Sequence, residues 1–223
     1  MKCLVKNEPA VGLTLQEVEK PSPKDNEILI QVKKAAICGT DLHIWNWDSW
    51  AQEKIKPPMT VGHEFMGVIE EVGKKIKNFK IGDRVSVESH ITGTKSRNAR
   101  AGKLHLDPDT VNLGVDTDGA FAEYVKVPES NVVPLPDSVS DEVGAILDPF
   151  GNAVHATLSF DLVGEDVLIT GAGPNRIMSA AIAEHVGARR ILLTDVNDQR
   201  LELAKKVCSA ELLNPTNSCF NKT

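Results

Sequence analysis

Residues 62–76 read Gly-His-Glu-Phe-Met-Gly-Val-Ile-Glu-Glu-Val-Gly-Lys-Lys-Ile, and this stretch decides how most of the chain is interpreted. His63 and Glu64 are neighbours, so in a regular strand their side chains would point to opposite faces. Both can reach one metal ion only from a turn, and Gly62 permits one because glycine tolerates positive φ. The apolar run Gly67–Val72 then predicts a strand. We therefore expect an imidazole and a carboxylate to be held side by side where a strand begins.

Residues 1–160 are otherwise made of short apolar runs that Gly, Pro and Asp interrupt. Such runs predict a compact, mostly β, barrel-like domain. Strands are expected at Leu13–Val18, Glu27–Ala36, Gly67–Val72, Arg84–Val87 and Ala120–Val127. Thr94–Lys103 is basic and polar without periodicity, which indicates an exposed loop.

After residue 160 the pattern changes to strand, glycine turn, helix, strand and helix, which is a βαβ unit with one more helix. The strands are expected at Asp166–Thr170 and Arg190–Thr194, and the helices at Ile177–Val186 and Asp198–Val207. We expect Arg190–Thr194 to form an unpaired sheet edge. Leu212–Thr223 is polar and turn-rich, which predicts a frayed tail.

A glycine-rich turn, Gly171-Ala172-Gly173-Pro174-Asn175-Arg176, joins the first of these strands to its helix. Gly171 makes the tight turn, and Gly173 lets a pyrophosphate approach the helix N-terminus. Asp195 ends the next strand about 20 residues further on, where an acid accepts the ribose hydroxyls of NAD and repels the 2′-phosphate of NADP. This order predicts a Rossmann-type site for NAD over residues 161–223.

Arg176 stands where the third glycine of this motif is expected. A small residue there lets the helix pack closely against the strand. A long cation has to push the helix away or swing out past the pyrophosphate. We therefore expect Arg176 to weaken NAD binding.

A second chemical segment, Ile37-Cys38-Gly39-Thr40-Asp41-Leu42-His43, adds a thiol to the imidazole and carboxylate. These are the ligand types of catalytic zinc, which keeps a fourth position for water or substrate. Taken alone, Cys38 is more often a small buried apolar residue, and His43 an ordinary half-buried histidine. The ordinary interpretation is also given to His90, His105 and His185.

Together these segments resemble the zinc-containing alcohol dehydrogenases of the medium-chain dehydrogenase superfamily. The signature G-H-E-x-x-G-x-x-x-x-x-G-x-x-I is matched without a gap by Gly62, His63, Glu64, Gly67, Gly73 and Ile76. Cys38–Asp41 and Gly82–Val85 are similar to its usual companions. The resemblance reaches about residue 213 and implies a mixed α/β chain. It implies a GroES-like, zinc-binding catalytic domain over residues 1–160 and the first part (βαβα) of a Rossmann NAD-binding domain over residues 161–223.

Within that superfamily the chain is most similar to the L-threonine 3-dehydrogenases, of which Trp45–Asp48 and Asp148–His155 are typical. That resemblance implies oxidation of the threonine 3-hydroxyl with NAD to 2-amino-3-oxobutanoate. It implies a catalytic zinc on Cys38, His63 and Glu64, with Thr40, His43 and Asp148 in proton transfer. For NAD it implies contacts from Gly171, Gly173, Asn175, Asp195 and Arg200. The polyol dehydrogenases of sorbitol or butanediol type are the second choice.

The same family usually holds a second, structural zinc with four closely spaced cysteines. The matching positions here are Gly93, Ser96, Ala99 and Asp107. Because none is a cysteine, we expect the structural zinc site to be absent.

Composition excludes several other classes of function. The net charge of −6 argues against nucleic acid as a partner, and no apolar run is long enough for a membrane helix. The cysteines are Cys3, Cys38, Cys208 and Cys219, and their wide spacing indicates reduced thiols in a cytoplasmic protein. The expected partner is a small-molecule substrate. The family forms homo-oligomers, but the segments that pair its subunits are expected to be missing here.

Three interpretations stay open at this point. The first is a working zinc- and NAD-dependent dehydrogenase. The second is a truncated relative that folds, binds zinc and no longer catalyses, which Arg176 and the lost cysteines favour. The third is a non-enzymatic scaffold, which the Cys38, His63 and Glu64 triad disfavours because a scaffold has no need of it.

Overall fold

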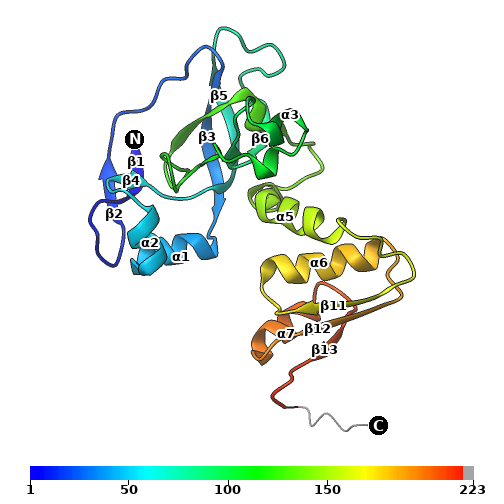
Figure 1. Ribbon diagram of the computed structural model, residues 1–223. Coiled ribbons are helices and arrows are strands. Elements are labelled where there is room, and N and C mark those ends of the chain that lie inside the picture. Colours follow the sequence, from blue (N-terminus) through cyan, green and yellow to red (C-terminus); the bar gives the residue numbers. More distant parts are fainter. Residues whose placement is uncertain (218–223) are drawn as a thin grey trace, which may run out of the picture. The chain divides into compact units, whose positions relative to one another are not determined.

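The computed structural model describes residues 1–217, and the chain divides into two compact units, residues 1–148 and 149–223. The first unit is built on a curled five-stranded sheet and the second on a small parallel sheet (Figure 1). The sequence therefore predicted a mixed α/β chain correctly. The domain boundary at residue 160 stays a prediction.

The large sheet of the first unit has the strand order β10-β6-β5-β3-β9, and every neighbouring pair is antiparallel. Its strands are β3 (Glu27–Ala36), β5 (Glu64–Val72), β6 (Arg84–Val87), β9 (Tyr124–Pro128) and β10 (Val132–Pro134). The pairing of β3 with β5 shifts register at Leu29/Ile30 and at Val32/Lys34. Such irregularities bend a strand and increase its twist, which lets the sheet curl.

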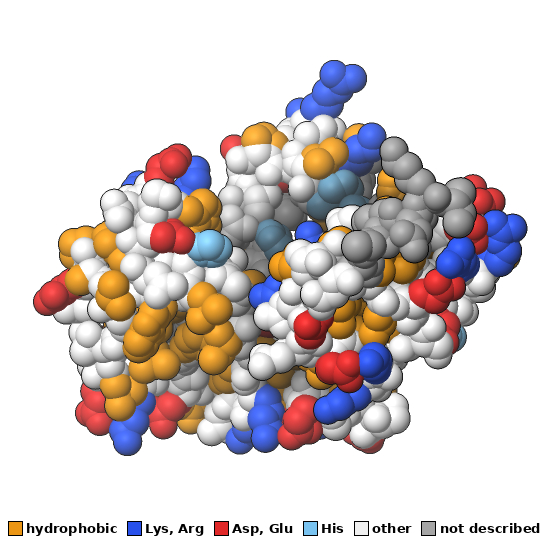
Figure 2. Space-filling view, turned by 90° about the horizontal axis from the view of Figure 1, so that it is seen from below, with side chains coloured by type: hydrophobic (Ala, Val, Ile, Leu, Met, Phe, Trp, Pro, Cys, Tyr) orange, Lys and Arg blue, Asp and Glu red, His pale blue; other side chains and the backbone are white. Residues whose placement is uncertain are grey.

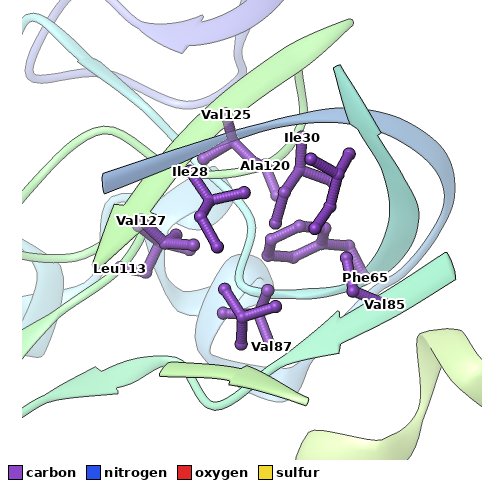
Figure 3. Packing of buried hydrophobic residues seen from close by; sticks show 11 residues of the cluster. Ile28, Ile30, Phe65, Val85, Val87, Leu113, Ala120, Val125 and Val127 are labelled. Atoms are coloured by element: carbon purple, nitrogen blue, oxygen red, sulfur yellow. The ribbon is translucent and has the colours of Figure 1, made fainter. Parts of the chain in front are cut away.

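The core of this unit fills the concave side of the curled sheet (Figure 3). Alternate residues of four strands point into it, as the period of two in a strand requires. The strand residues of the core include Ile28 and Ile30, Phe65 and Ile69, Val85 and Val87, and Val125 and Val127. The expected mostly β, barrel-like domain is thus confirmed, with β5 beginning at Glu64 and β9 ending at Pro128.

A second sheet of the first unit has the order β2-β1-β4. It comprises β1 (Lys2–Lys6), β2 (Thr14–Glu17) and β4 (Met59–Thr60), and the helices α1 (Gly39–Asn46) and α2 (Ser49–Lys54) follow β3. Lys6 is fully buried, and its ammonium donates hydrogen bonds to the carbonyl oxygens of Ala10, Gly12 and Trp45. These bonds hold the C-terminal end of α1 to β1.

The remaining elements of the first unit are short. They are β7 (His90–Ile91), α3 (Arg97–Arg100), the 3-10 turns η1 (Leu104–Leu106) and η2 (Glu129–Asn131), β8 (Val111–Asn112) and α4 (Asp141–Ala145); α5 (Leu147–Thr157) continues into the second unit. The expectation that Thr94–Lys103 is only a loop was wrong, because it contains α3. The hydroxyl of Ser96 accepts the backbone N–H of Ala99 and so starts this single turn of helix.

The second unit has three parallel strands in the order β11-β12-β13. Its elements are β11 (Asp166–Thr170), α6 (Pro174–His185), β12 (Arg190–Thr194), α7 (Asp198–Ala204) and β13 (Glu211–Leu213). Buried positions of α6 at Ile177, Ala180 and Ala183 share one core cluster with β12 and α7. The helix starts at Pro174 because proline suits the first turn, where its missing N–H is not needed.

Two expectations about this unit were wrong. Arg190–Thr194 is the central strand, not an edge, because Glu211–Leu213 pairs alongside it. The guanidinium of Arg190 donates two hydrogen bonds of 2.7 Å to the carboxylate of Glu211 and ties the two strands together. The predicted frayed tail therefore begins with a strand, and its last part, residues 218–223, lies outside the described residues.

Positive and negative side chains are interspersed on the face of the molecule in Figure 2, in keeping with the mixed composition of the chain. Over residues 1–217, no helix combines the length and the apolar character that crossing a bilayer requires.

Candidate metal centre

Cys38 lies in the turn between β3 and α1. Its backbone N–H donates a 2.8 Å hydrogen bond to Oδ2 of Asp41, three residues further on. A carboxylate at this position of a helix binds the free N–H of the preceding turn and favours the positive end of the helix dipole. The segment Cys-Gly-Thr-Asp thus fixes the start of α1 and, with it, the position of the thiol.

His63 and Glu64 lie where β5 begins, and Glu64 pairs with Ala36 at the end of β3. Gly62 has φ of 95°, and a Cβ atom on it would lie 2.4 Å from the Phe121 ring. Only glycine fits both the left-handed backbone and this contact. The turn that the sequence predicted at Gly62 is therefore present, and it places the imidazole and the carboxylate on the same site as Cys38.

The ligand atoms of Cys38, His63 and Glu64 all lie within 4.8 Å of one another. His63 and Glu64 are buried, and Cys38 is half-buried. A thiol, an imidazole and a carboxylate are a donor set that zinc accepts with one position left open. The three residues fit a catalytic zinc ion by their chemistry and by their convergence.

Asp41 stands behind His63, with its Oδ1 3.6 Å from the Nδ1 of the imidazole. Neither atom has a hydrogen-bond partner among residues 1–217, although both are buried. Carboxylates commonly orient a metal-binding histidine through the ring nitrogen that does not bind the metal. The geometry therefore leaves Nε2 of His63 for a metal ion.

The ionisable groups of this site have pKa values that are shifted from their ordinary values. Burial alone would lower the pKa of His63, but its hydrogen bond with Cys38 and the negative charge of Asp41 raise it to about 9. Burial raises the pKa of both Asp41 and Glu64. Each of these shifts is relieved when a cation lies among the groups, because the cation favours the ionised carboxylate and the unprotonated imidazole.

Asp148, at the start of α5, accepts a 3.1 Å hydrogen bond from the hydroxyl of Ser89. Burial and the nearby charge of Glu88 raise the pKa of Asp148. The ligand atoms of Glu88, His90 and Asp148 also lie within 4.8 Å of one another. His90 Nδ1 is 2.5 Å from Oε1 of Glu88, so His90 belongs to the polar surroundings of Asp148.

Thr40 and His43 lie on α1 beyond Cys38. The hydroxyl of Thr40 is 3.7 Å from the sulfur of Cys38. His43 is exposed, and its Nδ1 is hydrogen-bonded to Oδ2 of Asp48. Asp48 also accepts the N–H of Ala51 and begins α2, and the bond with His43 is the main cause of its lowered pKa.

Sequence reasoning missed the supporting residues Asp41, Asp48 and Ser89. The first two had a local signal, because an acid three residues after Cys38 and an acid before Ser49 are typical helix-start positions. Ser89 had none, since it meets Asp148 only through the fold.

The predicted dinucleotide residues come together in the second unit. Gly171 has φ of 88°, and Gly173 precedes α6. Asp195 is buried; its Oδ2 accepts the N–H of Ala172 at 2.6 Å and lies 3.7 Å from a guanidinium nitrogen of Arg200. Its Oδ1 accepts the N–H of residue 197 at 2.8 Å. Asn175 lies in the first turn of α6, and no contact links it to Asp195.

Arg176 does not prevent α6 from packing on the sheet. Its side chain folds back over the glycine turn, with Cδ and Nε 3.1 and 3.3 Å from where a Cβ on Gly171 would lie. The helix is thus not pushed away, as one of the two expected outcomes required, and the side chain lies beside the turn. Its effect on NAD binding stays a prediction.

Comparison with known proteins gives these sites their context. Residues 24–137 match the family model described as alcohol dehydrogenase GroES-like domain. An L-threonine 3-dehydrogenase of Rhizobium johnstonii is 58% identical over 207 residues, which are 93% of this chain and 60% of that protein. The chain thus spans about three fifths of the length of the curated relatives it matches.

Two solved structures are similar in fold. An alcohol dehydrogenase from Escherichia coli CFT073, complexed with NADH, is 30% identical with a TM-score of 0.90, over 98% of this chain and 63% of that one. The 2R,3R-butanediol dehydrogenase of Bacillus subtilis is 29% identical with a TM-score of 0.85, over 97% of this chain and 64% of that one.

Proposed function

This chain belongs to the alcohol dehydrogenase family that carries a GroES-like domain, and on that premise we propose that it holds the zinc site of an NAD-dependent dehydrogenase. Cys38, His63 and Glu64 bind one catalytic zinc ion. The observation that carries this proposal is the convergence of their ligand atoms within 4.8 Å. The buried pair of Asp41 and His63 supports it, because a bound cation would stabilise the buried carboxylate and the neutral imidazole.

The first role of the protein is to bind and orient. Zinc, when bound, acts as a Lewis acid that lowers the pKa of the substrate hydroxyl. Asp41, 3.6 Å from Nδ1 of His63, favours the ring orientation that turns Nε2 to the metal. The left-handed turn at Gly62 keeps His63 and Glu64 from separating to opposite faces of β5.

Its second role is to move a proton from the substrate hydroxyl to solvent. The Thr40 hydroxyl accepts and passes on this proton close to Cys38. His43 lies three residues further along α1, on the same side of the helix, and it is exposed to water. Asp48 holds the Nδ1 of His43, which leaves Nε2 of the ring to exchange protons.

Asp148 is the second acid–base group in this proposal. Ser89 orients its carboxyl, and its raised pKa makes it a better proton acceptor than an exposed aspartate.

The glycine turn of the second unit would hold NAD, which would supply the hydride acceptor when bound. Gly171 and Gly173 let the pyrophosphate approach the N-terminus of α6. Asp195 binds the ribose hydroxyls, and Asn175 and Arg200 contribute further contacts. The NADH in the E. coli structure with a TM-score of 0.90 supports a nicotinamide cofactor, and the preference for NAD over NADP rests on Asp195.

We propose L-threonine as the substrate, because 58% identity to an L-threonine 3-dehydrogenase covers 93% of this chain. A polyol such as 2,3-butanediol is the second candidate, and the similarity to the butanediol dehydrogenase favours it.

A substrate panel tests this function. The zinc-loaded chain is incubated with NAD or NADP and with threonine, sorbitol or 2,3-butanediol, and reduced cofactor is measured by absorbance. NAD-dependent turnover of threonine that disappears in Cys38→Ser is the expected result. Preference for a diol would mean that the chain acts as a polyol dehydrogenase instead. A chain that binds zinc and turns over none of the three would contradict the enzymatic assignment and leave a zinc-binding module.

A further inference from the structure

Residues 92–110 form a lobe between β7 and β8. The two short strands pair antiparallel at its base, with His90 opposite Asn112. Within the lobe only Asp107 is buried, at 6% exposure, and every other residue is half-buried or exposed. A connection of this length without an apolar core needs another source of order.

The carboxylate of Asp107 collects hydrogen bonds from both sides of the lobe. Its Oδ2 accepts the N–H of Gly93 at 2.5 Å, across 14 residues of chain. The side chain of Ser96 also stabilises the ionised carboxylate, and this interaction is the main cause of the lowered pKa of Asp107. The carboxylate therefore joins the first residues of the lobe to the last.

The interaction with Ser96 extends the connection to α3. The same hydroxyl accepts the N–H of Ala99 at 3.0 Å and so begins the helix. Further along, the side chain of Asn98 donates a 2.6 Å hydrogen bond to the carbonyl oxygen of Leu106. The middle of the lobe is thus tied to the segment that carries Asp107.

Gly93 can lie this close to the carboxylate because it has no side chain. A Cβ atom there would lie 2.9 Å from Oδ2 of Asp107, closer than such atoms approach. Any other residue at 93 would push the carboxylate away from the N–H that it accepts. Glycine is needed here for space, since its φ is not in the left-handed region.

The donor set does not fit the structural zinc that the family resemblance implies. Gly93 and Ala99 offer no side-chain ligand, and a serine hydroxyl is not among the usual zinc ligands. Of the four matching positions only Asp107 could bind a cation, and its oxygens already accept hydrogen bonds.

We propose that Asp107 closes the lobe by hydrogen bonds in place of a metal ion, so that residues 92–110 are ordered without zinc. The base of the lobe is also connected by hydrogen bonds to the polar surroundings of Asp148. The N–H of Leu113, just after β8, donates to the carbonyl oxygen of Ser89, whose hydroxyl binds Asp148.

Limited proteolysis of the full chain with trypsin tests this role. The lobe contains cleavage sites at Lys95, Arg97, Arg100 and Lys103. Lys74 and Lys77 in another exposed loop serve as internal standards. Asp107→Ala should speed cleavage in the lobe roughly tenfold relative to those standards, because local opening exposes the chain. The matched control is Asp109→Ala, which removes a neighbouring charge but not the clamp.

Three further measurements make the test independent of a single variant. Gly93→Ala should act in the same direction as Asp107→Ala, and the amide of Gly93 should exchange slowly in the unmodified chain. A chelator should leave lobe cleavage unchanged in the Cys38→Ser variant, where loss of an ion at Cys38 cannot interfere. Equal cleavage in Asp107→Ala and Asp109→Ala, fast exchange at Gly93, or acceleration by the chelator would each overturn the proposal.

Discussion

The metal centre of the first unit and the glycine turn of the second differ in how well their polar groups are satisfied. At the metal centre, Asp41 and His63 each have a buried polar atom that makes no hydrogen bond with any residue from 1 to 217. At the turn, Asp195 already accepts two backbone N–H groups and pairs with Arg200. A cation completes the first site, whereas a dinucleotide has to replace contacts that the second site already makes.

The same substitution should affect the two regions unequally. Gly62→Ala forces a side chain into a left-handed turn and against the Phe121 ring at 2.4 Å. Gly171→Ala forces the same left-handed strain but meets only the flexible side chain of Arg176 at 3.1 Å. We expect losses of about 2–4 kcal/mol for the first and about 1–2 kcal/mol for the second.

Urea unfolding followed by circular dichroism measures both. A loss for Gly171→Ala as large as that for Gly62→Ala would remove this difference between the turns.

Asp41→Asn should weaken zinc binding about 10- to 100-fold, because an amide holds the histidine ring less firmly than a carboxylate does. Competition with a chromophoric chelator measures the affinity. Asp48→Asn, beyond the C-terminal end of α1, is the matched control and should leave zinc affinity unchanged. Unchanged affinity in Asp41→Asn would mean that Asp41 does not act on the metal site.

Arg176→Gly should tighten NAD binding by roughly threefold to tenfold, since it clears the side chain from the turn where the pyrophosphate approaches. Isothermal titration of NAD into both chains gives the two affinities. If they are equal, Arg176 does not impair the site. Tighter binding by the unmodified chain would mean that the guanidinium contacts the pyrophosphate.

The smallest effect on stability is expected when the pH is lowered and Asp195 becomes protonated. The hydrogen bond from the N–H of Ala172 is the main cause of its lowered pKa. A lowered folded-state pKa contributes stability above the unfolded value of about 3.9, and that stability is lost as the pH falls through the folded value. The advantage of the unmodified chain over Asp195→Asn in urea unfolding should therefore shrink between pH 6 and pH 3. A constant difference would contradict this assignment.

Much of the fold could be predicted from local pattern. Glu27–Ala36, Arg84–Val87, Asp166–Thr170 and Arg190–Thr194 have the expected bounds because period and breakers define them. Glu211–Leu213 was missed because a three-residue strand has no period of its own and depends on Arg190.

The candidate site was predictable in part for the same reason. Cys38, His63 and Glu64 carry residue types and spacing that the sequence displays, and the structure brings them together. The contact of Ser89 with Asp148 could not be predicted, since it depends on segments about 60 residues apart that only the fold joins.

Zinc content per chain tests the central claim most directly. The full chain is purified with zinc, freed of excess metal and measured by atomic emission, beside Cys38→Ser and, as a control for thiol loss, Cys208→Ala. We predict about one zinc per chain in the unmodified protein and in Cys208→Ala, and close to none in Cys38→Ser. A folded chain without zinc, or zinc retained in Cys38→Ser, would contradict the assignment of Cys38, His63 and Glu64 as the metal site.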